Sequence, residues 1–129
     1  MMRVVFVCVE NSNRSQMAEA FANAIGGEKV EAFSAGSRPS GTVNPKAVSA
    51  MRELGIDMSR NTSKSLSELP QFEWDWVVTM GCGDACPHLP AKNRADWPVP
   101  DPKDLEPHQF NAVRDEIMRR VQGLLVDLE

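Results

Sequence analysis

The sequence of 129 residues has no tyrosine, two histidines and three cysteines. It also has no apolar run near the roughly 20 residues that a membrane-spanning helix needs, which excludes a helical membrane protein. Residues 1–3 lead directly into an apolar segment without the regions of a signal peptide. The net charge is −4 and no block of Lys or Arg is present, so a nucleic-acid partner is not expected. We expect a single soluble domain over residues 1–129.

The three cysteines are Cys8, Cys82 and Cys86. An odd number in a chain without a secretion signal favours reduced thiols and a cytoplasmic location. Glycine, serine, aspartate or proline lies near each of them, which indicates loops and reactive thiols rather than core packing. Cys82, Cys86 and His88 could instead supply three ligands of a metal site, although a fourth ligand is not evident and zinc cysteines usually come as Cys-x2-Cys pairs.

Strand and helix patterns alternate along the chain. Runs of β-branched and apolar residues predict strands over residues 3–7, 30–36 and 74–80, with a short edge strand over 97–99. Apolar residues at helical spacing predict helices over residues 15–25, 45–54 and 110–128, and one helical turn near 65–69. This alternation predicts an α/β fold, a single open parallel sheet of about four strands with helices on both faces. Ligands bind such sheets outside the carboxyl ends of the strands, which is where we expect Cys8, Ser34 and Cys82.

The segment that joins the first strand to the first helix combines a nucleophile with groups that bind an anion. A thiol in this position lies near the unpaired N–H groups and the positive dipole end of the helix, which favour the thiolate. The five residues between Cys8 and Arg14 can surround a tetrahedral oxyanion, and the planar guanidinium can bind two of its oxygens. Ser15 could hydrogen-bond the sulfur, and Asn11 could hold the loop. The predicted oxyanion-binding residues are Val9, Glu10, Asn11, Ser12, Asn13 and Arg14.

Residues 5–20 resemble the arsenate reductases that share the low-molecular-weight protein tyrosine phosphatase fold, whose topology is flavodoxin-like. The Cys-x5-Arg-Ser motif marks the superfamily, and Gln16-Met17-Ala18-Glu19 is typical of the reductases. The resemblance continues through Ser34-Ala35-Gly36, Asn44-Pro45, Gly55-Ile56-Asp57, Val77-Val78-Thr79-Met80, the Cys-rich segment 81–87 and Asp101-Pro102. It therefore covers nearly the whole chain.

This resemblance implies reduction of arsenate to arsenite, and so a role in arsenical resistance. Cys8 would attack the arsenic while the loop amides and Arg14 stabilise its oxygens, and Asp101 would protonate the departing hydroxide. A second thiol must then supply electrons; Cys82 would do so, with Cys86 closing a disulfide for an external reductant. The resemblance implies that no cofactor is bound and that phosphate and sulfate are analogues of the substrate. It implies no membrane partner.

The identity of the reductant stays open. Many thioredoxin-linked members carry a further cysteine where this chain has Asn13, and they have a longer segment between the two later cysteines. Only three residues separate Cys82 from Cys86 here, which is similar to actinobacterial enzymes. In those enzymes a small thiol such as mycothiol takes the arsenic adduct, and a glutaredoxin-like protein (mycoredoxin) reduces the result. The expected reductant is thioredoxin, or mycothiol or glutathione with a glutaredoxin-like protein.

A second departure concerns a cation beneath the loop. Some relatives bind potassium through side chains that match Asn11, Glu19 and Ser34, together with an acidic residue after a Thr-Ser pair. In this chain the Thr-Ser pair is followed by Lys64. We expect its ammonium group to supply the positive charge and to pair with Glu19, and we therefore expect no potassium dependence. The alternative is that Lys64 is a solvated surface residue.

Two other functions remain alternatives. A low-molecular-weight phosphatase acting on phosphotyrosine usually has aromatic residues around its mouth, often a tyrosine after Asp-Pro. This chain has no tyrosine, and Lys103 follows Asp101-Pro102, which favours a small inorganic anion. The other alternative is a non-catalytic binder of metal or metalloid that uses Cys82, Cys86 and His88.

Overall fold

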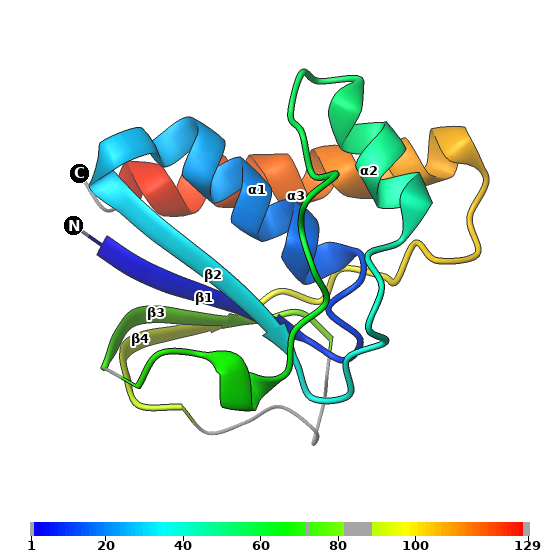
Figure 1. Ribbon diagram of the computed structural model, residues 1–129. Helices are drawn as coiled ribbons and strands as arrows, with labels where there is room; N and C mark the ends of the chain where they lie inside the picture. The colour runs from blue at the N-terminus through cyan, green and yellow to red at the C-terminus, as the bar shows by residue number, and fades with distance from the viewer. Residues whose placement is uncertain (1, 72, 82–88, 128–129) are drawn as a thin grey trace.

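Four parallel strands form one sheet, in the order β2-β1-β3-β4 (Figure 1). The computed structural model describes residues 2–71, 73–81 and 89–127. The strands are β1 (Met2–Cys8), β2 (Val30–Gly36), β3 (Trp74–Thr79) and β4 (Ala91–Asp96). The helices are α1 (Arg14–Gly26), α2 (Pro45–Arg52) and α3 (Pro107–Asp127), with short 3-10 helices η1 (Gly27–Lys29) and η2 (Leu66–Glu68).

The strand order places a topological switch point between β1 and β3. The chain runs from β1 to its neighbour β2 on one side, and later returns to add β3 and β4 on the other side. In open parallel sheets the crevice at the carboxyl ends of two such strands is the usual ligand site. Here β1 ends at Cys8 and β3 ends at Thr79, so the loops that follow these two residues are where the fold places a ligand site.

The two faces of the sheet are covered differently. Helices α1 and α3 lie across one face, and α2 packs against α3 beyond the carboxyl edge (Figure 1). The larger core lies between these helices and the sheet, and its fully buried side chains include Val4, Phe6, Met17, Phe21, Met51, Val78 and Ile117. The smaller core covers the other face, where η2 and its neighbours pack on the strands; it contains Val5, Val7, Trp74 and Val77, with Leu66, Leu69 and Leu89 packed against them. Within the described ranges the α-helices thus share one face, and a 3-10 helix covers the other.

The predicted α/β sheet is confirmed, but the predicted edge strand at residues 97–99 is wrong. The edge strand is β4, which contains Lys92, Asn93 and Arg94, all exposed. An edge strand pairs on one side only and tolerates charged residues that discourage pairing with another chain, so β4 lacks an apolar pattern. Trp97 and Val99 are instead buried in the loop that follows β4.

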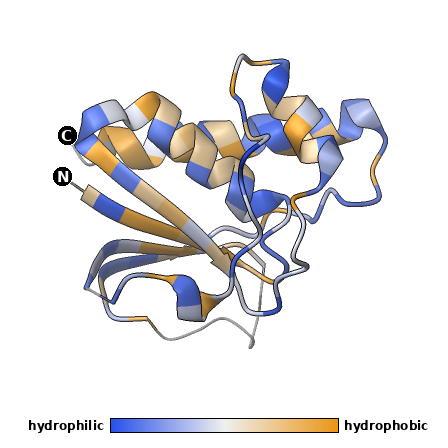
Figure 2. Cartoon of the chain, in the orientation of Figure 1, coloured by the Kyte–Doolittle hydropathy of each residue, from blue (hydrophilic) through white to orange (hydrophobic). Residues whose placement is uncertain are grey.

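Local signals account for the helices near the edge. Asn44 caps α2, because its Oδ1 accepts the N–H of Lys46 at 3.0 Å, and Pro45 occupies the first helical position. Figure 2 shows that the loops around this edge are largely hydrophilic, in contrast to the central strand β1. No helix in the described residues combines the length and apolar character needed to cross a membrane.

Candidate active site

The loop between β1 and α1 forms the wall of a cavity of about 210 Å³ at the carboxyl end of β1. Strand and helix fix its two ends, because Cys8 is the last residue of β1 and Arg14 is the first residue of α1. Asp101 reaches the same cavity from the loop between β4 and α3. The lining residues are Cys8, Val9, Glu10, Ser12, Asn13, Arg14 and Asp101. The fold therefore brings together the sulfur, the guanidinium and the carboxyl group that the sequence analysis singled out.

Two hydrogen-bond donors face the sulfur of Cys8, which is 2% exposed. The backbone N–H of Asn11 donates to Sγ at 3.2 Å, and Ser15 Oγ lies 2.8 Å from Sγ. Asn11 Nδ2 donates to Ser15 Oγ at 2.8 Å, which leaves the serine hydrogen free to point at the sulfur. The cap residue of α1, Asn13, makes no side-chain cap hydrogen bond. An anion in the cavity can thus serve as acceptor for the first N–H groups of the helix.

Asn11 is the fully buried centre of the loop. Its φ of 52° lies in the left-handed region, which asparagine tolerates better than most residues. Its Oδ1 accepts two hydrogen bonds, from Gln16 Nε2 and from the backbone N–H of Lys64, both at 2.8 Å. Both ends of the side-chain amide are therefore paired, and these bonds hold the loop in this conformation.

Arg14 connects the loop to the segment that carries Asp101. Its guanidinium is largely buried, and Nη1 donates to the backbone oxygen of Val99 at 3.1 Å. Gly81 lies against the same guanidinium with a φ of 80°, and a Cβ atom there would come well under 3.0 Å from Nη1. Its backbone conformation favours glycine, and a side chain at this position would displace the guanidinium. Gly81 directly precedes Cys82 in the sequence.

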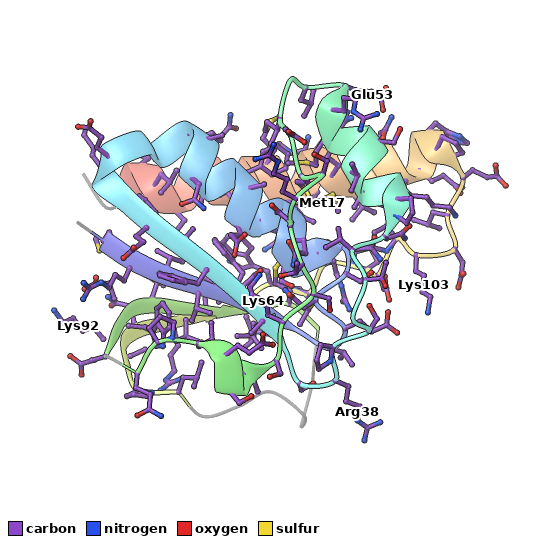
Figure 3. All side chains as sticks on the ribbon, viewed as in Figure 1. Met17, Arg38, Glu53, Lys64, Lys92 and Lys103 are labelled. Carbon is purple, nitrogen blue, oxygen red and sulfur yellow. The ribbon has the colours of Figure 1, made fainter. Side chains whose placement is uncertain are left out.

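The mouth of the cavity is bridged by an ion pair. Glu10 Oε1 lies 3.4 Å from Lys103 Nζ, and the backbone N–H of Lys103 donates to Asp101 Oδ1 at 3.1 Å. Asp101 itself is exposed. Lys103 thus ties the loop of Asp101 to the loop of Cys8. Figure 3 shows Lys103 and Arg38 extending outward from this edge of the molecule.

Lys64 lies beneath the loop with its side chain 26% exposed, and its ammonium group donates to the backbone oxygen of Thr62 at 3.1 Å. Its ammonium group is 3.8 Å from Glu19 Oε1, which also accepts the Ser34 hydroxyl at 3.1 Å (Figure 3 shows Lys64 near the end of β2). Burial raises the pKa of Glu19, while the charge of Lys64 and the hydrogen bond from Ser34 oppose that rise. Two donors thus pair with Asn11 Oδ1, and the Ser34 hydroxyl and the Lys64 ammonium group both face Glu19 Oε1.

Two residues that the sequence analysis noted only as part of the family resemblance also hold the loop. Gln16 is fully buried and bonds Asn11. Gly36 pairs with Cys8 across the sheet, and a Cβ atom there would lie 2.5 Å from Val9 O and 2.9 Å from the Asn11 nitrogen. The available signals were a polar residue directly after Ser15, near the start of the predicted helix, and a glycine at a strand end.

The predictions for Cys82, Cys86 and His88 concern residues outside those that the structure describes. This applies to the second thiol, to its disulfide and to the alternative metal site. Within residues 2–71, 73–81 and 89–127, no three His, Cys, Asp or Glu side chains are grouped so that they could hold a metal ion.

Comparison with known proteins gives consistent matches over almost the full length. Residues 3–129 match the family described as low molecular weight phosphotyrosine protein phosphatase. Arsenate reductase 1 of Staphylococcus haemolyticus is 43% identical over 123 residues, which cover 92% of this chain and 91% of that protein. Glutaredoxin arsenate reductase of Synechocystis sp. is 36% identical over 131 residues and covers 99% of both. A solved structure described as an arsenate reductase in the phosphate binding state has a TM-score of 0.89 at 36% identity and covers 100% of both chains.

Proposed function

The chain belongs to the low molecular weight phosphotyrosine protein phosphatase family, and we propose that it is an arsenate reductase in which Cys8 is the nucleophile. Named arsenate reductases at about 40% identity support the activity. The observation that carries the mechanism is the shared cavity, where Cys8, Arg14 and Asp101 meet and where two donors face the sulfur.

In the first step the Cys8 thiolate attacks the arsenic of bound arsenate. The N–H groups of residues 9–14 and the Arg14 guanidinium bind the oxygens and stabilise the charge that builds on them. One As–O bond breaks, and Asp101 delivers a proton so that the departing hydroxide leaves as water. The product is an arsenic adduct on the Cys8 sulfur, with arsenic still in its +5 state.

In the second step another thiol attacks the Cys8 sulfur, the S–As bond breaks, and its electron pair leaves with arsenic as arsenite. Arsenic is thereby reduced from +5 to +3 and two thiols are oxidised to a disulfide. Cys82 would be this thiol, with Cys86 forming the final Cys82–Cys86 disulfide. In the small-thiol version an external thiol takes the arsenic adduct from Cys8, and the thiol of a glutaredoxin-like protein attacks the sulfur of that external thiol and releases arsenite, which leaves a mixed disulfide. The name of the Synechocystis relative supports a glutaredoxin-type reductant. Thiols that cycle in this way suit the reducing cytoplasm.

Beneath the loop, Glu19, Ser34 and Lys64 act as supports for Asn11. The Lys64 ammonium supplies a fixed positive charge, and its backbone N–H orients the Asn11 amide. This arrangement keeps the Asn11 N–H and the Ser15 hydroxyl directed at the sulfur without a bound cation.

Arsenite formation with three reductants tests the function and its second step. The reductants are thioredoxin with its reductase, glutathione with glutaredoxin, and mycothiol with mycoredoxin. Wild type is expected to turn over arsenate with at least one system. If thioredoxin is the donor, Cys82→Ser and Cys86→Ser abolish turnover; if a small thiol is the donor, Cys82→Ser turns over normally. Hydrolysis of phosphotyrosine without arsenite formation would instead support the phosphatase alternative.

A further inference from the structure

We infer that Gln16 is a positioning residue for Cys8: it sets the direction of a buried chain of hydrogen bonds that ends at the sulfur. This inference rests on the proposed function only in taking Cys8 as the nucleophile. Gln16 lies in the first turn of α1 and is fully buried. Its side chain does not line the cavity, so it acts through its neighbours rather than on the substrate.

The amide of Gln16 is paired at both ends. Nε2 donates to Asn11 Oδ1 and to the backbone oxygen of Thr62, both at 2.8 Å. Its Oε1 accepts from Asn61 Nδ2 at 3.2 Å. Because a buried amide left unpaired is costly, all of these partners together determine which way the amide faces. A backbone oxygen can only accept, so Thr62 O requires that Nε2, and not Oε1, face this side.

The same pairing of donors with acceptors fixes the orientation of each group between Gln16 and the sulfur. Nε2 of Gln16 can pair only with an acceptor, so Asn11 presents Oδ1 to it and Nδ2 to Ser15. The Lys64 N–H, which can only donate, selects the same orientation of Asn11. Ser15 Oγ then accepts from Asn11, and its own hydrogen is left for Cys8 Sγ at 2.8 Å. If the Asn11 amide were reversed, Ser15 would donate to Asn11 and the sulfur would lose a donor.

Two variants at Gln16 test whether it sets the donor-to-acceptor direction of these hydrogen bonds. Gln16→Glu keeps the shape but presents carboxylate oxygens to the oxygens of Asn11 and Thr62, whereas Gln16→Met removes the donor without adding charge. The matched controls are Gln122→Glu and Gln122→Met, at an exposed position on α3. A Cys82→Ser, Cys86→Ser background leaves Cys8 as the sole cysteine. The ultraviolet absorbance of its thiolate, followed against pH, then reports on Cys8 alone.

Gln16→Glu is expected to raise the midpoint of thiolate formation by about one pH unit or more, since a reversed Asn11 amide takes one hydrogen bond from the thiolate. Gln16→Met is expected to raise it in the same direction but by less, because the Lys64 N–H still pairs with Asn11 Oδ1. With Cys82 and Cys86 restored, kcat for arsenate is expected to fall about tenfold or more with little change in KM, because the groups that bind arsenate are untouched. The Gln122 variants should change neither quantity. Unchanged midpoints and kcat in folded Gln16 variants would overturn the inference. The titration needs no turnover, so it remains informative if the chain does not reduce arsenate.

Asn61 gives a second test if the Gln16 variants do not fold. It is only partly buried, so substitutions there are more easily accommodated. The carboxylate of Asn61→Asp would attract Gln16 Nε2 and turn the Gln16 amide away from Asn11. Asn61→Ala removes one donor to Gln16 Oε1 but does not reverse the Gln16 amide. Asn61→Asp is therefore expected to raise the thiolate midpoint and Asn61→Ala to leave it nearly unchanged. Equal midpoints in the two variants would contradict the inference.

Discussion

Gly81 lies so close to Arg14 that a single added methyl group would collide with the guanidinium. The two residues are 67 positions apart in the sequence, and the contact joins the end of β3 to the start of α1. Arg14 also donates to Val99 O, two residues before Asp101. One guanidinium thus connects the anion loop, the segment that carries Asp101 and the residue that precedes Cys82.

The first prediction is that Gly81→Ala weakens arsenate binding. The added Cβ displaces Nη1 from Val99 O, so the guanidinium is no longer positioned to bind the oxygens of the oxyanion. We expect KM for arsenate, or Kd for phosphate, to rise about tenfold or more, since hydrogen bonds to charged groups contribute about 1.5–3 kcal/mol. Steady-state kinetics and phosphate titration measure these constants.

Gly55→Ala is the matched control. Gly55 has a φ of 78°, close to the 80° of Gly81, but nothing lies within 4 Å of the position that its Cβ would take. Both variants carry the same backbone strain of about 1–2 kcal/mol. Gly55→Ala should therefore lose stability without losing arsenate affinity. If both variants bound arsenate as wild type does, Arg14 would not depend on Gly81.

The second prediction is that the protein does not respond to potassium. Donors already pair with Asn11 Oδ1 and Glu19 Oε1, and the Lys64 ammonium supplies the positive charge. We expect equal kcat and equal Tm in potassium and sodium chloride at the same ionic strength. Lys64→Asp should create a response, because two neighbouring carboxylates need a cation between them. Activation of wild type by potassium but not by sodium would refute this prediction.

The third prediction follows from the raised pKa of Glu19. Its ordinary value is 4.5, and burial is the largest cause of the rise. The folded protein holds this proton more tightly than the unfolded chain does. The carboxyl group therefore favours folding below about pH 4.5, and this contribution is lost as the pH rises through the raised pKa.

Glu19→Gln removes this titration. The free energy of unfolding of wild type minus that of Glu19→Gln should fall as the pH rises above about 4.5 and then become constant. Urea denaturation at a series of pH values measures the difference. In a Lys64→Met background the fall should extend to higher pH, because Lys64 lowers the pKa of Glu19. A difference that rose with pH would show that burial is not the dominant cause.

The β1-α1 unit could be predicted because all of its signals are local. An apolar run, a cysteine, an arginine six positions on and an apolar helix lie within residues 3–25. The edge strand could not be predicted from Lys92, Asn93 and Arg94, since these successive side chains are all exposed and show no alternation of apolar and polar residues. Its position follows from pairing with β3, which is a property of the folded sheet.

Two further supports of the loop, Gln16 and Gly81, could not be predicted in this role for a different reason. Gln16 bonds a carbonyl oxygen 46 residues away, and Gly81 lies against a side chain 67 residues away. Neither requirement leaves a pattern near the residue itself. Asp101 entered the site only through the family resemblance, because an Asp-Pro pair alone indicates a turn.

Arsenite formation by Cys8→Ser tests the central claim most directly. Reduced wild type and reduced Cys8→Ser are incubated with arsenate and an excess of a small dithiol, and the arsenite released is measured over time. We predict steady release by wild type, suppressed by phosphate that competes for the cavity, and release by Cys8→Ser no faster than in buffer. Release by Cys8→Ser at the wild-type rate would contradict the account.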